Sequence, residues 1–254
     1  MRLQTGISLV ALALLLLCSC ASRKNVAYLQ NIESASVGQA NAFEPTLKPD
    51  DLLSIIISAE TPEVTVPFNM PAIQGNYEIN NNQNGIKTYL IDTGGNIEFP
   101  VIGRIKLGGL TRAEAIDKIS AAVAVYIKNP SVNLRILNYK VSVLGEVNQP
   151  GTFTLASERI TLLEALSLAG DLTIYGKRDN ILVIREADGK KTFTRVDITK
   201  ADFMSSPFYY LTQNDQIVVE PNKTRINASA FGPNVTAVIS VLSLVATLAI
   251  LIVR

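Results

Sequence analysis

The pattern of apolar and polar residues divides the chain into an apolar start, a mixed middle and an apolar end. Residues 7–17 are almost entirely apolar, and residues 235–253 contain no charged side chain. Between these segments, short alternating or β-branched runs are separated by turns rich in glycine, proline and asparagine, which is typical of short strands. Two helical segments interrupt the strands. The sequence therefore predicts an α+β protein flanked by segments that meet a membrane.

The first predicted unit spans residues 44–138. A β-branched run over residues 52–57 predicts a strand, and Thr93-Gly94-Gly95 predicts a hairpin turn because glycine accepts the positive φ of tight turns. Thr111-Arg112-Ala113-Glu114 has the form of a capping box, in which the Thr and Glu side chains satisfy the first free amides of a helix. An alternating strand over residues 131–138 is expected to follow that helix.

The second predicted unit, residues 139–221, repeats this order. The segment VSVLGEVNQPGTFTL, residues 141–155, predicts two strands around a Pro150-Gly151 turn. Thr161-Leu162-Leu163-Glu164 is a second capping box with a helix after it. The polar residues Glu146, Asn148 and Gln149 near the first turn are interpreted as solvated, with contact to a neighbouring subunit or a polymer as the alternative.

The start of the chain has the order of a secretory signal, with Arg2 before the apolar run and small residues after it. Leu17-Cys18-Ser19-Cys20 fits a bacterial lipobox, with Cys20 as the residue that becomes acylated. Residues 1–19 are then the signal peptide and residues 20–43 a lipidated tether. An ordinary signal peptide or a signal anchor is the alternative.

The apolar end predicts a transmembrane helix over residues 233–253, after a linker over residues 222–232. At ~1.5 Å per residue, residues 235–253 span roughly 28 Å as a helix, close to the hydrocarbon thickness of a bilayer. The alternative is a helix buried in the core of a soluble domain. Four hydroxyl residues fall on one face of this helix at spacings of four, three and four: Thr236, Ser240, Ser243 and Thr247. They predict either a pore lining or a seam of close helix packing, and the sequence leaves both open.

Composition excludes several classes of function. Lys+Arg 23 against Asp+Glu 22 gives a net charge of +1, so the basic footprint of a nucleic-acid-binding protein is missing. The chain has no histidine, and its only cysteines are Cys18 and Cys20, which argues against a metal site, a disulfide and a histidine base. We expect no cofactor. The carboxylates Glu98, Glu146, Glu158 and Asp171 show no spacing that singles out a catalytic pair, so we expect no enzyme.

Taken together, these motifs resemble the outer-membrane polysaccharide export family. LKPDDLLSI and YLIDTGGNIEFPVIGRIKLGGLTRAEAIDKI resemble its export domain, with Asp50-Asp51 where the family usually has Gly-Asp. VSVLGEVNQPGTFTL and TLLEALSLAGDLTIYGKRDNILVIR resemble the soluble-ligand-binding β-grasp (SLBB) domain that follows it. The signal, the lipobox, both domain signatures and the terminal helix occur in the family's order.

The resemblance implies an outer-membrane lipoprotein with domains in the periplasm, which exports capsular or extracellular polysaccharide. It also implies a homo-oligomeric ring, octameric in the best-known members, and an inner-membrane co-polymerase linked to a tyrosine autokinase as partner. Two departures are visible: the chain has one β-grasp-like unit where larger relatives have two, and its terminal helix is unusually apolar. The alternative is a membrane-anchored accessory lipoprotein that binds sugars or a partner and forms no pore.

Overall fold

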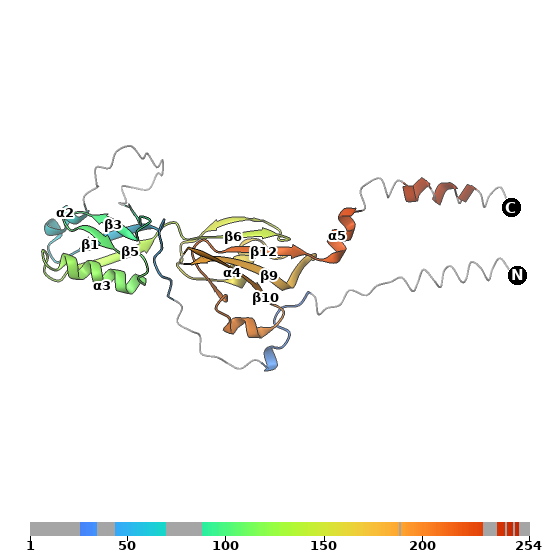
Figure 1. Ribbon diagram of the computed structural model, residues 1–254, viewed down its shortest axis with the longest axis horizontal. Helices are drawn as coiled ribbons and strands as arrows, with labels where there is room; N and C mark the ends of the chain where they lie inside the picture. Colours follow the sequence, from blue (N-terminus) through green and yellow to red (C-terminus); the bar gives the residue numbers. More distant parts are fainter. Residues whose placement is uncertain are drawn as a thin grey trace.

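The computed structural model describes residues 26–34, 44–69, 88–187, 189–230, 238–241, 243–245 and 247–248. The predicted signal peptide, Cys20 and Thr236 lie outside these residues. The described chain forms two α+β domains arranged end to end along the long axis of the molecule, with α5 leaving the second domain at the end opposite the first (Figure 1).

The first domain is a three-stranded antiparallel sheet with one long helix. Its elements are β1 (Leu52–Ser58), η3 (Pro62–Thr65), α2 (Val66–Asn69), β2 (Thr88–Leu90), β3 (Asn96–Phe99), β4 (Gly103–Lys106), α3 (Arg112–Val123) and β5 (Ser131–Ile136). The sheet order is β2-β1-β5, and β3 and β4 form a separate hairpin. Leu53, Ile55 and Ile57 alternate along β1 and are buried in the same hydrophobic cluster as Ile119 and Val123 of α3. This alternation gives the domain one buried face.

The turn predicted at residues 93–95 is present, closed by the Asp92 amide donating to Asn96 O at 2.8 Å and the Gly95 amide donating to Asp92 O at 2.9 Å. The strands on either side of it, however, do not pair with each other. β2 pairs with β1, and β3 pairs with β4. Gly95 has a φ of +80°, as predicted for a glycine in this turn, and it also lies against a second turn. Gly95 O accepts hydrogen bonds from the amides of Leu107 and Gly108, and a Cβ on Gly108 would lie 2.7 Å from Gly95 Cα. The glycines at this turn therefore allow two turns to approach each other closely.

The second domain is a five-stranded mixed sheet that holds a short helix. Its elements are β6 (Lys140–Gly145), β7 (Gly151–Thr154), β8 (Ile160–Thr161), α4 (Leu162–Leu168), β9 (Gly176–Ala187), β10 (Lys190–Val196), η4 (Ala201–Ser205), β11 (Tyr210–Leu211) and β12 (Gln216–Pro221). The sheet order is β10-β9-β12-β6-β7, and only β12 and β6 run parallel within it. Leu162 and Leu166 of α4 are buried in one cluster with Val141, Val143 and Ile217 of the sheet.

Both predicted capping boxes are confirmed. The Glu114 amide donates to Thr111 Oγ1 at 3.2 Å, and Glu114 Oε2 accepts from the Thr111 amide at 2.8 Å. Thr161 and Glu164 make the same two bonds at 3.2 and 2.7 Å. Both glutamates therefore satisfy free amides at a helix start.

The two domains are joined by the short junction of residues 138–140, which is hydrogen-bonded to both of them. Asn138 Oδ1 accepts from the Leu52 amide at 2.9 Å and Asn138 Nδ2 donates to Asp50 O at 2.8 Å, which ties the junction to the first domain. On the other side, Gln213 Nε2 donates to Asn138 O at 2.8 Å, and Gln213 Oε1 accepts from the Lys140 amide at 2.7 Å. These four hydrogen bonds tie the junction to both domains.

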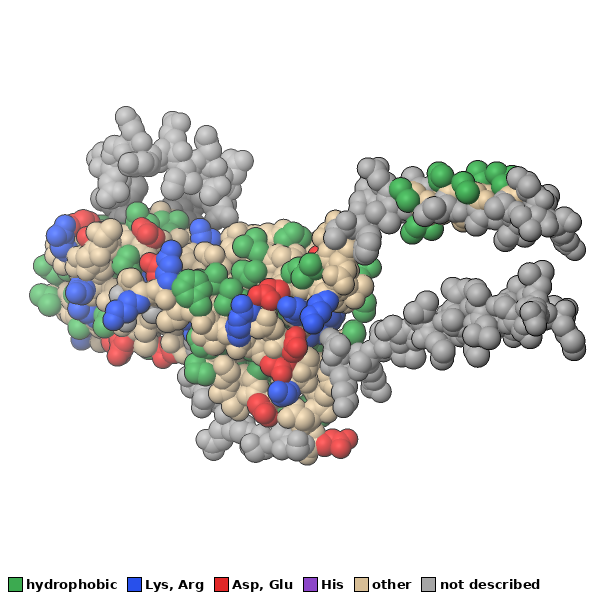
Figure 2. Space-filling model, turned by 45° about the vertical axis from the view of Figure 1, so that its right-hand side comes forward, with side chains coloured by type: hydrophobic (Ala, Val, Ile, Leu, Met, Phe, Trp, Pro, Cys, Tyr) green, Lys and Arg blue, Asp and Glu red, His purple; other side chains and the backbone are tan. Residues whose placement is uncertain are grey.

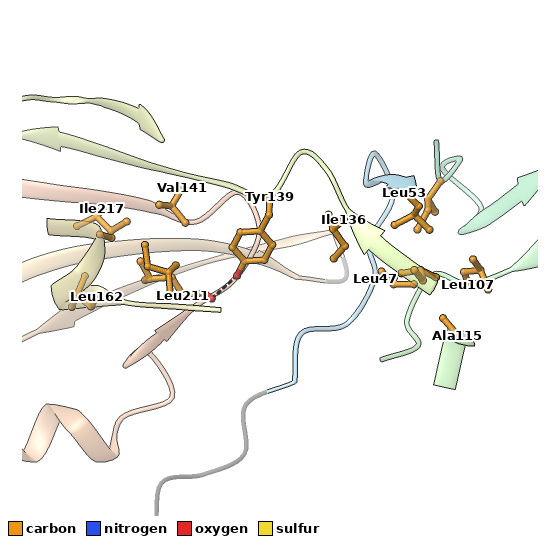
Figure 3. Packing of buried hydrophobic residues seen from close by; sticks show 14 of the residues in the cluster. Leu47, Leu53, Leu107, Ala115, Ile136, Tyr139, Val141, Leu162, Leu211 and Ile217 are labelled. Carbon is orange, nitrogen blue, oxygen red and sulfur yellow. Dashed lines mark hydrogen bonds between the residues drawn. The ribbon is translucent and has the colours of Figure 1, made fainter. Parts of the chain in front are cut away.

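Tyr139 fills the space between the domains. Its side chain is fully buried, and its hydroxyl donates to the Leu211 carbonyl at 2.8 Å. Figure 3 shows the ring between Ile136 of the first domain and Leu211 of the second. The buried residues of both domains belong to one continuous hydrophobic cluster, so the junction is part of the core.

Part of the predicted tether is packed on the second domain. The Leu29 and Gln30 amides donate to the carbonyls of Ile198 and Thr199 at 3.3 and 2.7 Å, and η2 (Ile32–Ser34) follows. Asn31 Oδ1 accepts from the Ala201 amide at 2.6 Å. These are mainly backbone bonds, which leave no periodic pattern in the sequence.

The predicted linker and terminal helix are only partly described. Residues 223–230 of the linker form a helix, α5 (Lys223–Ala230). Residues 238–241, 243–245 and 247–248 are helical, and the rest of residues 233–253 lie outside the described residues. Within the part of the chain that the structure describes, no helix has both the length and the hydropathy needed to cross a membrane.

Removing the Tyr139 hydroxyl should destabilise the junction. In Tyr139→Phe the buried Leu211 carbonyl loses its donor, so we expect the free energy of unfolding to fall by about 1–3 kcal/mol. Urea unfolding of the purified protein in detergent, followed by circular dichroism, measures this. Tyr126→Phe is the control, because that ring is 58% exposed. Equal stability of the two variants would contradict a structural role for the buried bond.

Asp51 should make stability depend on pH. Burial raises its pKa from 3.8 to about 6, and the charges of Asp50 and Glu158 act in the same direction, while the hydrogen bond from the Lys48 amide opposes them. Because the folded chain binds this proton more tightly than the unfolded chain, the Asp51 contribution is fully present below pH ~4 and is lost as pH rises through about 6.

We therefore expect the wild type to lose up to about 3 kcal/mol of unfolding free energy relative to Asp51→Asn between pH 4 and pH 7. Urea unfolding of both proteins at a series of pH values measures the difference between their unfolding free energies. The contributions of the other carboxylates are the same in both proteins and cancel in this difference. A constant difference across this range would show that Asp51 titrates normally.

Candidate functional site

A polar cleft of about 810 Å³ lies between the two domains. The first domain contributes Arg112 and Arg135, and the second contributes Glu158 and Arg159. Glu44, which precedes the first domain, completes the charged lining. Ile136 and Leu137, which lead into the junction, also line the cleft, so it lies beside the point where the two domains are joined.

The cleft carries more positive than negative charge. Glu158 binds Arg112 Nε at 3.4 Å and accepts from the Ile136 amide at 3.1 Å, so it belongs to the contact between the domains. Among the residues that the structure describes, neither Arg135 nor Arg159 has a carboxylate partner, and Arg159 lies 5.4 Å from the centre of the Tyr210 ring. A guanidinium group can bind a carboxylate through two parallel hydrogen bonds.

The carboxylates that were considered for catalysis each have a structural partner. Glu98 binds Arg104 at 2.9 Å on the exposed β3–β4 hairpin, and Glu158 serves the domain contact described above. Glu146 and Asp171 hold chain segments at the far end of the second domain. Within the described ranges, no three histidine, cysteine, aspartate or glutamate residues form a group suited to a metal ion.

Glu146 fixes the start of α5. Its Oε1 binds Arg225 Nε at 3.1 Å, its Oε2 accepts from Thr173 Oγ1 at 2.8 Å, and its side chain is only 17% exposed. The expectation that Glu146 lies on a solvated turn is therefore wrong. Asn148, expected there too, donates through Nδ2 to Gly170 O at 2.7 Å, so it also holds a neighbouring turn.

The loop over residues 171–176 (the 171–176 loop) also binds α5 directly. The Asn222 amide donates to Tyr175 O at 2.7 Å, and the Arg225 guanidinium lies 5.5 Å from the centre of the Tyr175 ring. Asn222 Oδ1 in turn accepts from the Arg225 amide at 3.0 Å, so Asn222 caps α5. Asn222 after Pro221 was the one sequence signal for this helix, which has no apolar face to reveal it.

The same loop binds the N-terminal segment. Tyr28 Oη donates to Asp171, and the Arg178 guanidinium lies 5.3 Å from the centre of the Tyr28 ring. Burial raises the pKa of Tyr28 to about 12, with the hydrogen bond to Asp171 as the next cause, so the hydroxyl stays protonated. Arg178 also donates to Gly176 O at 3.1 Å. The 171–176 loop therefore holds both segments that lead away from the domains.

The predicted hydroxyl stripe is partly described. Ser240, Ser243 and Thr247 lie on helical residues, while Thr236 and the predicted lipidation site Cys20 lie outside the described residues. Thr247 Oγ1 donates to Ser243 O at 2.8 Å within the same helical segment. Such a bond satisfies a hydroxyl in an apolar setting, and it suits a pore lining and a packing seam equally.

Comparison with known proteins identifies both domains. The family model described as polysaccharide biosynthesis/export protein matches residues 39–137, and the SLBB domain model matches residues 139–219. The chain is 32% identical over 199 residues to the EPS I polysaccharide export outer membrane protein EpsA of Ralstonia solanacearum, which covers 75% of this chain and 52% of that protein. It is 35% identical over 161 residues to the protein of the same name from Ralstonia nicotianae, covering 60% and 42%. The chain thus spans about half the length of the curated relatives it matches.

Breaking the Glu146–Arg225 pair should loosen α5. In Glu146→Gln the charged contact is lost, and a loss of about 1 kcal/mol would raise the rate of trypsin cleavage after Lys223 and Arg225 about five-fold. Mass spectrometry of a timed digest measures the rate. Glu98→Gln is the matched control, because it breaks an exposed ion pair in the first domain. Unchanged cleavage in Glu146→Gln would mean that α5 is held by other contacts.

Proposed function

The chain belongs to the polysaccharide export protein family, and from this premise we propose that it is an outer-membrane lipoprotein forming a homo-oligomeric channel for capsular or extracellular polysaccharide. The observation that carries the proposal is the succession of an export domain and an SLBB domain, in a chain that is similar to proteins named as outer-membrane export proteins. In this proposal Cys20 carries the lipid, both domains lie in the periplasm, and an inner-membrane co-polymerase with a tyrosine autokinase delivers the polymer.

The rigid junction supports assembly into a ring. A head-to-tail contact between identical subunits closes into a ring only when the subunit presents its two contact surfaces at a constant angle. The bonds around Asn138 and Gln213 hold the two domains at such an angle. An octamer is the number we expect from the family.

The surface of the first domain also supports subunit contacts. Exposed apolar side chains occur on several of its elements, and the largest exposed fractions are those of Val125 at 79%, Leu90 at 59% and Tyr126 at 58%. Ile56, Val64 and Val66 are also exposed. Apolar groups of this size on a surface are typical of protein contacts when they gather in one region.

The membrane passage is assigned to residues 233–253. In a ring, the copies of this segment cross the outer membrane together, with Thr236, Ser240, Ser243 and Thr247 either lining the passage or packing neighbouring helices. The cleft between the domains offers Arg135 and Arg159 to carboxylates of the passing polymer.

Deleting residues 233–254 should abolish surface polysaccharide. The truncated and full-length proteins are expressed in a strain that lacks its own copy, and surface polymer is quantified. Arg254→Gln is the matched control, because it keeps the whole apolar segment and should export normally. Electron microscopy of the full-length protein in detergent should show rings with a central cavity.

Two results would contradict the channel. Normal surface polymer after the deletion would favour the accessory lipoprotein that binds sugars or a partner without a pore. Particles without a central cavity would also favour the accessory lipoprotein. Loss of polymer together with rings supports the export channel.

A further inference from the structure

The 171–176 loop and the first turns of α5 lie where the chain leaves the second domain toward both proposed membrane anchors. We infer that they form a lipid-contacting surface, in which Ile174 and Tyr175 insert at the headgroup level of the membrane. This inference rests on the proposed function, because that function supplies the acylated Cys20 and the membrane-crossing segment.

The N-terminal anchor cannot be far from this loop. Tyr28 is fixed to Asp171 by its hydroxyl and to Arg178 by its ring. Cys20 precedes Tyr28 by eight residues, and a fully extended chain covers at most ~3.6 Å per residue. The lipid on Cys20 therefore attaches within about 29 Å of Tyr28.

The C-terminal anchor starts from the same place. α5 is fixed at its first turn through Asn222 and Arg225, and it leaves the end of the second domain that faces away from the first (Figure 1). The uncharged segment begins at Val235, five residues after Ala230, which allows at most about 18 Å between them. Two anchors that begin beside one loop bring the membrane surface to that loop.

The side chains at this end have the chemistry of a membrane interface. Ile174 is 61% exposed, Tyr175 37% and Ile226 51%. Lys223 and Arg225 lie beside them on α5, which contains no acidic residue. Figure 2, which brings this end of the molecule forward, shows hydrophobic side chains close to Lys and Arg side chains. An aliphatic and an aromatic side chain next to basic residues suit the boundary between acyl chains and anionic headgroups.

The loop is also held in shape, so that contact with lipid requires no reordering. The Tyr175 amide donates to Thr173 Oγ1 at 3.1 Å, and the Gly176 amide donates to Thr173 O at 3.1 Å. Of the nearby carboxylates, Glu146 is paired with Arg225, and Asp171 accepts hydrogen bonds from Tyr28 Oη and the Leu172 amide. The Glu146–Arg225 pair has no net charge, so Glu146 repels an anionic headgroup less than a free carboxylate would.

The chain contains no tryptophan, so one introduced tryptophan reports its own surroundings without background. We would place Ile174→Trp, Tyr175→Trp and the control Val125→Trp separately in the full-length protein. Val125 is 79% exposed and lies in the first domain, at the other end of the molecule. Each protein is reconstituted into phosphatidylethanolamine–phosphatidylglycerol vesicles, with incorporation verified by flotation, using plain lipid or lipid brominated near the top of the acyl chains.

The fluorescence of Ile174→Trp and Tyr175→Trp should be blue-shifted and quenched about twofold by brominated lipid, because the interface places both side chains near the bromine atoms. Val125→Trp should give the same emission in both kinds of vesicle. Emission of both loop variants that is insensitive to bromine would overturn the inference.

The outcome is separable from that of the export channel. Quenching at residues 174 and 175 without rings or polymer export would leave the lipid contact standing and remove the channel. Rings and normal export without quenching would leave the channel standing and remove the lipid contact.

Discussion

The hydrogen bonds around Asn138, Tyr139 and Gln213 determine how the two domains are placed, and much of the molecule depends on them. Backbone groups at a junction that is partly buried between two domains need hydrogen-bond partners. Here Asn138 bonds to β1 with its side chain and accepts from Gln213 with its carbonyl, while Tyr139 reaches the Leu211 carbonyl. The charged cleft between the domains follows from this placement, since its arginines come from both domains.

A second set of contacts performs a similar task at the other end of the second domain. The 171–176 loop binds Tyr28 through Asp171 and α5 through Tyr175, so the segments on either side of the two domains are tied to one short stretch of chain. Between the junction and this loop lies the five-stranded sheet. The two domains thus form one unit that is hydrogen-bonded to the chain segments on either side of it.

Local features were predictable from sequence, while features that join distant residues were not. The capping boxes at Thr111 and Thr161 were found because each involves residues three apart. The turn at residues 93–95 was predicted correctly, but the pairing of the strands around it was not, because the choice of partner for β2 and β3 depends on tertiary packing. α5 was missed because its capping residue is visible in the sequence but its polar composition shows no helical periodicity. The junction bond joins residues 138 and 213, and nothing in either neighbourhood indicates the other.

The parallel pairing of β6 with β12 has a mechanical consequence. These are the strands by which the chain arrives in the second domain and leaves it, and they are direct neighbours in register from Ser142↔Gln216 to Gly145↔Val219. Since the two strands point the same way, tension between the first domain and α5 pulls them lengthwise past each other. Their hydrogen bonds then resist together, in shear, instead of opening one after another. A subunit pulled from both ends is therefore reinforced along the line of force.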